Sequence, residues 1–342
     1  MENGDGNFRR FGWIAVLLAL SAGAVALVLG GARPPQSSGV KTPVGALSGK
    51  KVLFLDSYHE GYEWSDGIAS GIRSKLEGTG VQLKIVHMDT KRNPEEEFKR
   101  RAGEAAKAEI ERFSPDVVIS ADDNAFKYVV MPFYRDAKLP IVFCGINWDA
   151  SSYGAPYSNT TGMVEVSLTT RLIADLSGFA KGSRIGYLSA DTETERKNAF
   201  YYDKLFSIKF SKVSFVKTMK EWEDAFDRMQ KEVDILIFEN NAGIADWDAD
   251  AAAAFAKSHT RIPVGTTNPW VMPTALMGLT KVPEEQGEWS AMRALDIIKG
   301  AKPSDIPVTT NERGDIFLNF TIADELGVRL PPALIKSAKV VR

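Results

Sequence analysis

The first group of residues that could do chemistry follows an apolar run near the start of the chain. Residues 52–55 read Val-Leu-Phe-Leu and lead into the loop "DSYHEGYEW" at residues 56–64, which carries hydroxyl, carboxylate, imidazole and aromatic groups. An apolar run of this kind is typical of a buried parallel strand, and open α/β sheets bind ligands at the carboxyl ends of their strands. The loop is therefore predicted to form part of a ligand site.

Several kinds of chemistry lack their usual sequence pattern. There is neither G-x-G-x-x-G nor G-x-x-x-x-G-K-[ST], so the sequence indicates no dinucleotide or triphosphate site. His59, His87 and His259 stand apart, without an H-x-x-x-H pair or a cysteine partner, and no G-x-S-x-G elbow is present. We therefore expect no catalytic residue, no cofactor and no required metal. We interpret the single Cys144 as a buried small hydrophobe rather than a nucleophile.

Composition and charge restrict the class of protein. The chain has 342 residues, of which 44% are hydrophobic and 25% charged, enough for two domains with their own cores. The formal net charge of -2 gives no reason to expect a nucleic-acid partner, because phosphate binding depends on clustered lysine and arginine. One cysteine cannot form a disulfide within the chain, so stability must come from packing.

The N-terminal segment has the pattern of an export signal. Arg9 and Arg10 precede an uncharged, mostly apolar run at residues 11–31, and a Pro/Ser/Gly-rich linker follows. The run is about as long as the hydrocarbon core of a bilayer requires. Residues 1–32 are therefore either a cleaved signal peptide or an uncleaved membrane anchor, and residues 33–48 are the linker. In both cases we expect the rest of the chain outside the cytoplasm, in the periplasm or at the outer face of the inner membrane.

From residue 51 onward, apolar runs alternate with helical patterns, which is typical of parallel sheets with crossover helices. The pattern goes through two rounds, and two similar α/β lobes favour a ligand site in a cleft between them. The first round has predicted strands near residues 52–55, 81–88, 116–120 and 140–144. The second round has predicted strands near residues 184–188, 213–216, 233–238 and 262–265.

Several phrases match a known family: "DSYHEGYEWSDGI", "HMDTKRNPEEE", "FCGINWD", "TGMVEV", "ALMGLTKVPEEQGEWSA", "GAKPSDIPV" and "LGVRLPPALIKSAKVV". On these residues the chain resembles the extracytoplasmic substrate-binding proteins of ABC transporters, in the branch related to aromatic-amino-acid binders and to sensor modules of signalling proteins. The resemblance covers nearly all of residues 51–342. It implies an α/β protein of the type I periplasmic-binding fold, in which two Rossmann-like (flavodoxin-like) lobes with parallel sheets are joined by a three-crossing hinge and close on a small ligand.

The resemblance also implies how the chain divides between the lobes. The first lobe would combine residues 49–164 with about 275–304, and the second would combine residues 165–274 with about 305–342. The three crossings are expected near residues 162–166, 268–274 and 307–317.

A two-lobed protein that closes on a ligand needs side chains from both lobes at the ends of strands, because contacts on both sides stabilise the closed form. The candidates therefore follow predicted strands or lie at a predicted crossing. The predicted ligand-binding residues are Ser57, Tyr58, Trp64, Asp122, Asp123, Asn124, Asn147, Glu165, Ser189, Asn240, Asn268 and Trp270.

The candidates also have structural interpretations. The serine and tyrosine at residues 57–58 could cap or underlie the following helix, and one of residues 122–124 could be the N-cap of a helix. Glu165 could meet a ligand amine or hydrogen-bond the backbone of the hinge. Trp270, like Trp148, could stack on a flat ligand or pack one lobe against the other.

These inferences lead to one principal hypothesis and one alternative. The protein is expected to be an extracytoplasmic solute-binding protein that closes on a small organic ligand for an ABC permease. An aromatic amino acid is one candidate ligand, and purines, nucleosides and small organic acids stay open. The alternative is a ligand-sensing module, held at the membrane by residues 11–31, that signals to a membrane sensor kinase. An enzyme is not expected, because no nucleophile, base and oxyanion arrangement can be assembled from the motifs.

Overall fold

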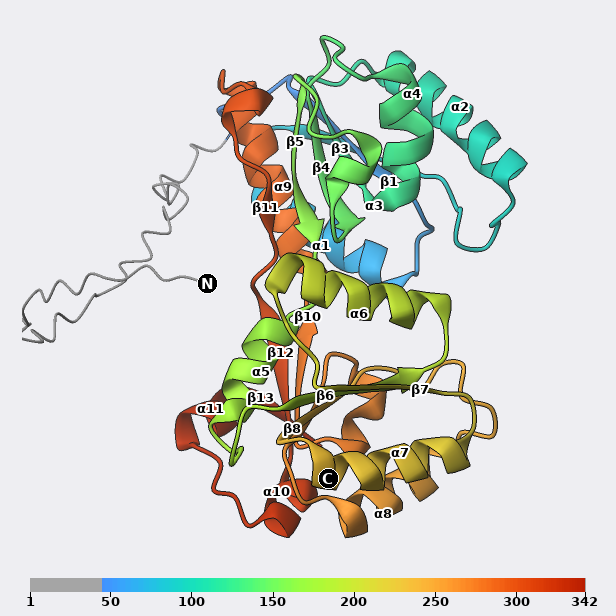
Figure 1. Cartoon of the computed structure of the whole chain (residues 1–342). Helices are drawn as coiled ribbons and strands as arrows, with labels where there is room; N and C mark the ends of the chain where they lie inside the picture. The colour runs from blue at the N-terminus through green and yellow to red at the C-terminus, as the bar shows by residue number, and fades with distance from the viewer. Residues whose placement is uncertain (1–44, 342) are drawn as a thin grey trace, which may run out of the picture. The chain divides into compact units, whose positions relative to one another are not determined.

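The computed structural model describes residues 45–341 of the chain. The predicted signal peptide or anchor at residues 1–32, and most of the predicted linker, lie outside the described residues. No helix within residues 45–341 has the length and apolar character needed to cross a bilayer. Two β-sheets with helices packed on them make up this part of the chain, one sheet in each of two lobes (Figure 1).

The first sheet is parallel throughout, and α-helices connect its first four strands along the chain. Its central strands are buried on both faces, which explains their continuous apolar sequences. In spatial order the strands are β11 (Thr309–Thr310), β5 (Thr160–Glu165), β4 (Ile141–Asn147), β3 (Val117–Ala121), β1 (Lys51–Asp56) and β2 (Gln82–His87). The helices of this lobe are α1 (Glu63–Leu76), α2 (Glu96–Phe113), α3 (Asp122–Ala125), the π-helical η1 (Phe126–Val130), α4 (Met131–Phe133) and α9 (Pro283–Ile298).

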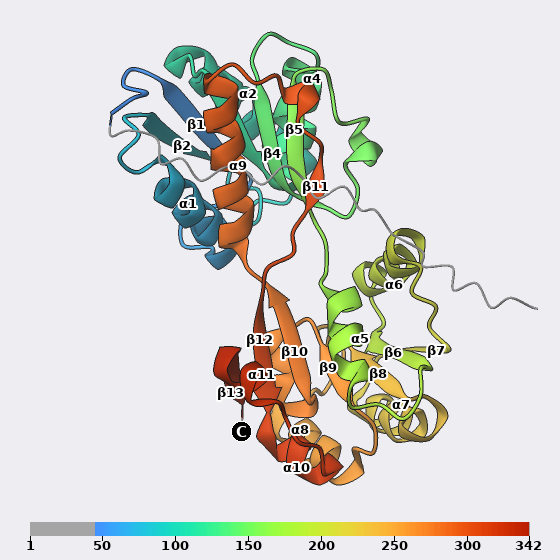
Figure 2. The same ribbon diagram turned by 90° about the vertical axis from the view of Figure 1, so that its left-hand side faces the viewer.

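Helix α9 comes from late in the sequence, yet it packs beside α1 in the first lobe (Figure 2). The two helices approach so closely that a Cβ at Gly287 of α9 would lie 2.0 Å from the carbonyl oxygen of Ile68 in α1. Only glycine permits this approach without a backbone shift. Ile72 of α1 and Leu295 of α9 are buried in the same apolar cluster, so the late segment is an integral part of the first lobe.

The second sheet repeats the strand order of the first. β6, the first strand of the second round, lies between β7 and β8, just as β1 lies between β2 and β3 in the first sheet. The pair β10 with β12 is antiparallel, and the other pairs of this sheet within the described residues are parallel. The strands are β13 (Ala338–Val341), β12 (Gly314–Asn319), β10 (Met277–Lys281), β9 (Val264–Thr266), β8 (Ile235–Phe238), β6 (Ile185–Ala190) and β7 (Lys212–Val216). The helices are α5 (Thr169–Ser177), α6 (Glu193–Phe206), α7 (Met219–Glu232), α8 (Ala249–His259), α10 (Phe320–Leu326) and α11 (Pro332–Ser337).

Four helices of the second lobe begin at side chains that cap them. Thr192, Thr218, Asp248 and Asn319 precede α6, α7, α8 and α10, and each side-chain oxygen accepts from a backbone N–H three residues further along. Such a cap satisfies one of the free donors in the first turn of a helix. The cap at Thr192 fixes where α6 begins, and α6 contributes several residues to the cleft described below.

The chain passes three times between the lobes: after β5, between β10 and α9, and between β11 and β12. The second passage differs from the expected one near residues 268–274. Those residues form the 3₁₀ turn η3 (Pro269–Thr274), and β10 then pairs with β9, so the return to the first lobe falls at residue 282 rather than at about 275. In addition, β11 pairs with β5, which places residues 309–310 in the first lobe rather than the second. An apolar run predicts a strand but does not specify which sheet the strand joins.

Candidate ligand-binding cleft

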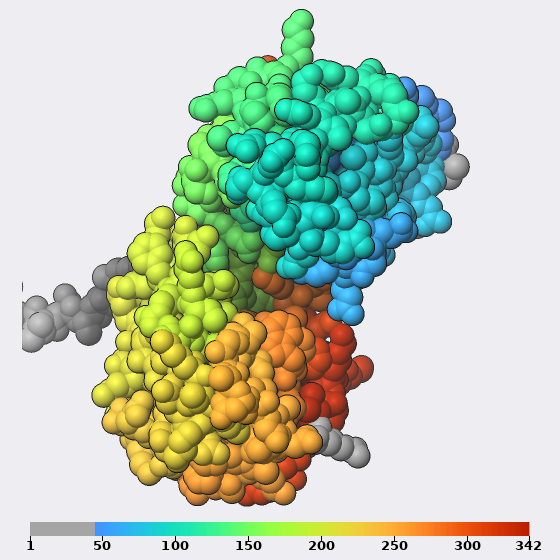
Figure 3. Space-filling model, turned by 90° about the vertical axis from the view of Figure 1, so that its right-hand side faces the viewer, coloured from blue at the N-terminus to red at the C-terminus, as the bar shows by residue number. Residues whose placement is uncertain are grey.

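Two adjoining cavities lie between the lobes, and both are lined from both lobes. The first, here the Glu239 cavity, has a volume of about 240 Å³, and the second, the Asp122 cavity, has a volume of about 520 Å³. Figure 3 shows the surface hollowed between the two lobes. The residues that line both cavities are Asn147, Glu165, Thr267, Asn268, Trp270 and Lys281.

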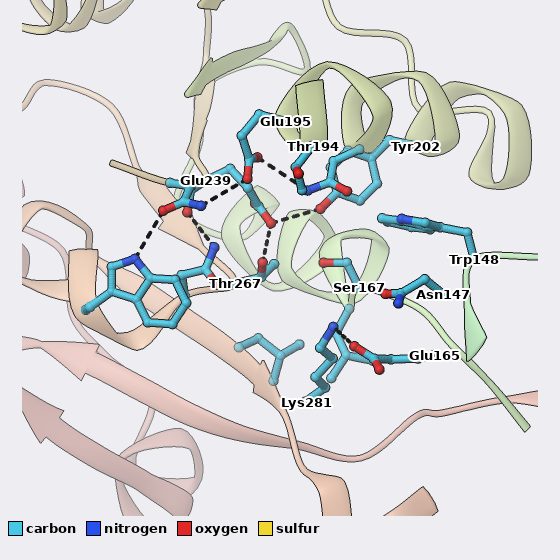
Figure 4. A pocket seen from close by; sticks show the side chains of 16 residues that line it. Asn147, Trp148, Glu165, Ser167, Thr194, Glu195, Tyr202, Glu239, Thr267 and Lys281 are labelled. Atoms are coloured by element: carbon cyan, nitrogen blue, oxygen red, sulfur yellow. Dashed lines mark hydrogen bonds and ion pairs between the residues drawn. The ribbon is translucent and has the colours of Figure 1, made fainter. Parts of the chain in front are cut away.

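Glu239 follows β8 and is a buried acid of its cavity, with 3% of its surface exposed. The hydroxyl of Tyr202 in α6 donates to its Oε1 at 3.0 Å, and the Thr267 hydroxyl donates to the same oxygen (Figure 4). Oε2 is buried without a hydrogen-bond partner among the described residues. Burial raises the pKa of Glu239 to about 7, although the two hydroxyl donors act in the opposite direction. This carboxyl group can therefore change its charge near neutral pH.

Glu195 of α6 lies in the same cavity but has no free oxygen. The amide of Asn240 donates to its Oε1 at 3.0 Å, and the hydroxyl of Tyr187 donates to its Oε2 at 3.0 Å. Asn240 in turn accepts from the indole N–H of Trp270 at 3.3 Å. These bonds hold the Trp270 ring at the cleft although more than half of its surface is exposed.

An ion pair joins the two lobes at the centre of the cleft. Glu165 ends β5 of the first sheet, Lys281 ends β10 of the second, and their charged groups are in direct contact (Figure 4). The Lys281 ammonium also lies 5.5 Å from the ring centre of Trp64 in α1. Both ends of this ion pair sit where the chain crosses between lobes, so the pair links the hinge to the ligand cavities.

Asp122 is the buried acid of the other cavity, with 2% of its surface exposed. It has a left-handed backbone with φ of 67°, and the indole N–H of Trp64 donates to its Oδ1 at 3.2 Å. Its Oδ2 has no partner among residues 45–341. Burial, followed by the charge of Glu165, raises the pKa of Asp122 well above its usual range. A Cβ at Gly145 would come within 2.8 Å of Oδ1, so glycine is required beside this carboxyl group.

Tyr58 and Tyr62 form the outer wall of the Asp122 cavity. Their rings meet edge to face with centres 5.1 Å apart. The ammonium of Lys91 lies 5.2 Å from the centre of the Tyr58 ring and 4.9 Å from that of Tyr62. Lys91 thus brings a positive charge to the rim, held by aromatic faces.

Trp148 forms part of the Glu239 cavity and also contacts the opposite lobe. It follows β4 of the first lobe, but its ring stacks on Tyr201 of α6 with centres 5.5 Å apart and meets Tyr202 edge-on at 5.3 Å. Next to it, the Lys204 ammonium of α6 lies 3.7 Å from a carboxylate oxygen of Asp149. α6 therefore contacts the first lobe through rings and an ion pair.

The structure brings most of the predicted ligand-binding residues together and separates four from the cavities. The residues that line one or both cavities are Tyr58, Trp64, Asp122, Asn147, Glu165, Asn240, Asn268 and Trp270. The predicted residues that line neither cavity are Ser57, Asp123, Asn124 and Ser189.

Three of these four side chains form hydrogen bonds within the first lobe. The Ser57 hydroxyl donates to the carbonyl of Ala121 at 2.6 Å and accepts from the backbone N–H of Ala125 at 2.8 Å. The amide of Asn124 donates to the Thr90 hydroxyl at 2.8 Å.

Asp123 accepts from the Asn147 amide at 2.7 Å and from the Tyr153 hydroxyl at 2.7 Å, so it orients Asn147. Ser189, in the second lobe, is fully buried and donates to the carbonyl of Asn240 at 3.3 Å. These four residues hold the strand ends in place and do not face the cleft.

Sequence reasoning missed the residues that α6 contributes to the cleft. Thr194, Asn198 and Tyr202 line the Glu239 cavity and recur every four residues, which places them on one face of the helix. The polar and aromatic residues on this face of the helix were the signal in the sequence that could have indicated a ligand site. Lys281 was missed because no strand was predicted at residues 277–281, which were expected to belong to the first lobe.

Metal ligation and cysteine chemistry have little structural basis in this part of the protein. Residues 45–341 contain no group of three or more His, Cys, Asp or Glu side chains that could hold a metal ion. Cys144 is fully buried in β4, and burial raises the pKa of its thiol, which disfavours the reactive thiolate.

Two flavodoxin-like lobes with mostly parallel sheets, three passages of the chain between them and a cleft at the strand ends define a type I periplasmic-binding fold. The chain belongs to the family of ABC transporter substrate-binding proteins, since the family model matches residues 63–342. No curated protein sequence matches the chain.

Solved structures share this fold at low sequence identity. The ligand-free, open structure of CD0873, a substrate-binding protein with adhesive properties from Clostridium difficile, is 16% identical, with a TM-score of 0.65 over 86% of this chain and 99% of that one. An ABC transporter solute-binding protein from Bradyrhizobium, solved with bound bis-tris, is 15% identical, with a TM-score of 0.52 over 85% and 87%. An ABC domain from Streptococcus pneumonia, solved with L-Trp, is 18% identical, with a TM-score of 0.51 over 86% and 100%.

Proposed function

We propose that this protein binds an amino acid with an aromatic side chain, outside the cytoplasm, and presents it to an ABC permease. One observation carries the proposal: both lobes line the cleft with aromatic rings and with charges of both signs. An aromatic amino acid carries a ring, an ammonium and a carboxylate, and each of these groups has a complementary group in the cleft. Trp64, Trp148, Tyr202 and Trp270 offer rings, Lys91 and Lys281 offer cations, and Glu239 and Asp122 offer acids.

Binding from both sides gives the ligand a means to favour one arrangement of the lobes. A ligand shifts a conformational equilibrium only by its difference in affinity for the two states. We propose that residues 45–165 with 282–311, and residues 166–281 with 312–341, form the two units that close on it. The permease would then recognise the closed arrangement.

The solved structure that contains L-Trp supports the ligand class only in a general way. It demonstrates that this fold can hold an aromatic amino acid in that protein. For the present chain, the aromatic and charged lining of the cleft provides the independent support.

A thermal unfolding screen tests the proposal. The purified protein is heated with each of the twenty amino acids, with nucleobases and with small organic acids. Because a ligand that binds only the folded state at a hundred times its Kd stabilises by about 2.7 kcal/mol, an aromatic amino acid is expected to raise the Tm by several degrees. A set of stabilisers that contains nucleobases or organic acids but no amino acid would contradict the proposed ligand.

Trp270→Ala is the matched control for this screen. The Trp270 ring lines both cavities and is 56% exposed, so its loss should leave the Tm of the free protein nearly unchanged. The shift caused by the amino acid should become smaller, because a stacking partner is lost. An undiminished shift would show that the ligand does not stack on Trp270.

A further inference from the structure

The acids of the cleft differ in how completely the protein satisfies them. Glu165 contacts the ammonium of Lys281, and both oxygens of Glu195 accept hydrogen bonds. Glu239 and Asp122 each keep one buried oxygen without a partner among the described residues. An unpaired buried acceptor costs free energy, so these two oxygens are the places where a ligand donor gains the most.

The electrostatic surroundings distinguish the two. Asp122 is near three other acids, Glu165, Asp56 and Asp123, and they oppose its ionisation in addition to its burial. Glu239 has hydroxyl donors from Tyr202 and Thr267 on its Oε1, which stabilise its ionised form.

The charged and titratable groups that face Glu239 come from three elements. Glu195 and Tyr202 belong to α6, Tyr187 belongs to β6, and Lys281 belongs to β10. Glu195 opposes the ionisation of Glu239, whereas the positive charge of Lys281 favours it. Glu239 is consequently the acid of the cleft that an incoming cation can most readily ionise.

We propose that Glu239 receives the protonated amine of the ligand through its free Oε2, and thereby sets which way round the ligand lies in the cleft. The amine then points into the second lobe, beside the rings of Trp148 and Tyr202 that line the same cavity (Figure 4). This inference rests on the proposed function, since it assigns a residue to one group of an amino-acid ligand.

Proton release follows from this arrangement. In the free protein the pKa of Glu239 is about 7, so near that pH about half of the molecules carry a proton on this group. An ammonium next to the carboxylate favours the charged form and expels the proton. Binding of an amine should therefore release about half a proton at pH 7, and affinity should fall by up to about tenfold per pH unit below that.

The experiment uses three probes that share one ring system: L-tryptophan, tryptamine, which lacks the carboxylate, and indole-3-propionate, which lacks the amine. Calorimetric titrations in phosphate and in Tris, whose ionisation enthalpies differ, give both the affinity and the number of protons released. For the unaltered protein we expect proton release with L-tryptophan and tryptamine, and binding of indole-3-propionate at least about tenfold weaker than that of L-tryptophan.

Glu239→Gln keeps an oxygen for the donors Tyr202 and Thr267 but cannot ionise. It should weaken L-tryptophan binding by about tenfold to a hundredfold and abolish the proton release. Asp122→Asn alters the competing acid, and asparagine tolerates the left-handed backbone there. In that variant the proton release and the preference for L-tryptophan over indole-3-propionate should persist.

The possible failures are distinct. If L-tryptophan binds but indole-3-propionate binds equally well without proton release, the assignment of Glu239 is overturned while the proposed function stands. The same holds if Asp122→Asn, and not Glu239→Gln, removes the preference for the amine. If no aromatic amino acid or amine binds at all, the proposed function itself is wrong, and the assignment of Glu239 falls with it. If Glu239→Gln does not fold, Asp122→Asn still separates the two acids, because loss of the amine preference and of proton release in that variant would overturn the assignment of Glu239.

Discussion

The two lobes share a strand order but differ after the third strand of each round. In the first lobe, β3 is followed by Asp122, which lines the cleft, and by Asp123 and Asn124, which bond to other groups of that lobe. In the second lobe, β8 is followed by Glu239 and Asn240, and both line the cleft. The two sets have similar chemistry, so the residue types do not explain the difference.

The length of the chain after the strand accounts for it. In the first lobe β3 ends at Ala121 and α3 begins at the next residue, so nearby polar groups are needed to hold the short connection. In the second lobe β8 ends at Phe238 and α8 begins only at Ala249, and the intervening loop has room to turn its amides toward the cleft. Of these two strand ends, the one with the longer loop contributes more residues to the cleft.

The largest effect that would test this comparison concerns stability at different pH values. Burial raises the pKa of Glu239 from 4.5 to about 7 in the folded protein, so the folded state keeps a proton that the unfolded chain has lost. The resulting stabilisation is fully present below the unfolded pKa of 4.5 and is lost as the pH rises through about 7. Glu239→Gln cannot ionise and should gain about 3 kcal/mol relative to the unaltered protein between pH 4.5 and pH 8.

Urea unfolding of both proteins at the two pH values measures this difference. The sign should be the same for Asp122→Asn, because burial also raises the pKa of that carboxyl group. A difference between Glu239→Gln and the unaltered protein that stays constant with pH would show that Glu239 is no more buried in solution than an exposed acid.

A smaller effect should separate two serines at the end of the first strand of each round. Ser57 bonds to both the Ala121 carbonyl and the Ala125 N–H, whereas Ser189 makes one long bond to the Asn240 carbonyl. Ser57→Ala leaves the buried N–H of Ala125 without its hydroxyl acceptor and should cost about 1–3 kcal/mol of stability. Ser189→Ala should cost less than about 1 kcal/mol.

Urea unfolding at one pH measures both losses. Neither variant should change the affinity for L-tryptophan by more than the loss of stability explains. Equal losses of stability would show that the two bonds of Ser57 stabilise the first lobe no more than the single bond of Ser189 stabilises the second.

The sequence predicts the fold better than it predicts the cleft. The α/β class and the two lobes are confirmed, because strand runs and their alternation with helices depend on local apolar pattern. The predicted position of the second crossing was wrong, because the apolar pattern around Met277 fits a strand of either sheet.

Side-chain roles in the cleft depend on partners far away in sequence. Asn124 follows the buried strand β3 and Asn147 ends the buried strand β4, but Asn124 bonds to Thr90, whereas Asp123 orients Asn147 at the cleft. Tyr202 was missed because only tertiary contacts bring its hydroxyl to Glu239.

The smallest expected effect separates two tyrosines that bond to different acids of one cavity. The Tyr202 hydroxyl donates to Glu239 and lowers its pKa, so Tyr202→Phe should raise the pH at which amine binding is half-maximal by about half to one unit. The ring stays, and with it the contact with Trp148. Thr267 still donates to the same oxygen, which limits the shift.

Tyr187→Phe is the matched control, because it removes a hydroxyl at the same distance from a buried acid, but that acid is Glu195. The affinity for L-tryptophan, measured by calorimetry from pH 5 to pH 9, should keep its midpoint in this variant. If both variants shift the midpoint equally, Glu239 does not titrate alone but together with Glu195 of α6. If only Tyr202→Phe shifts it, then one carboxyl group of the second lobe controls binding, which is the asymmetry that the two halves of the cleft display.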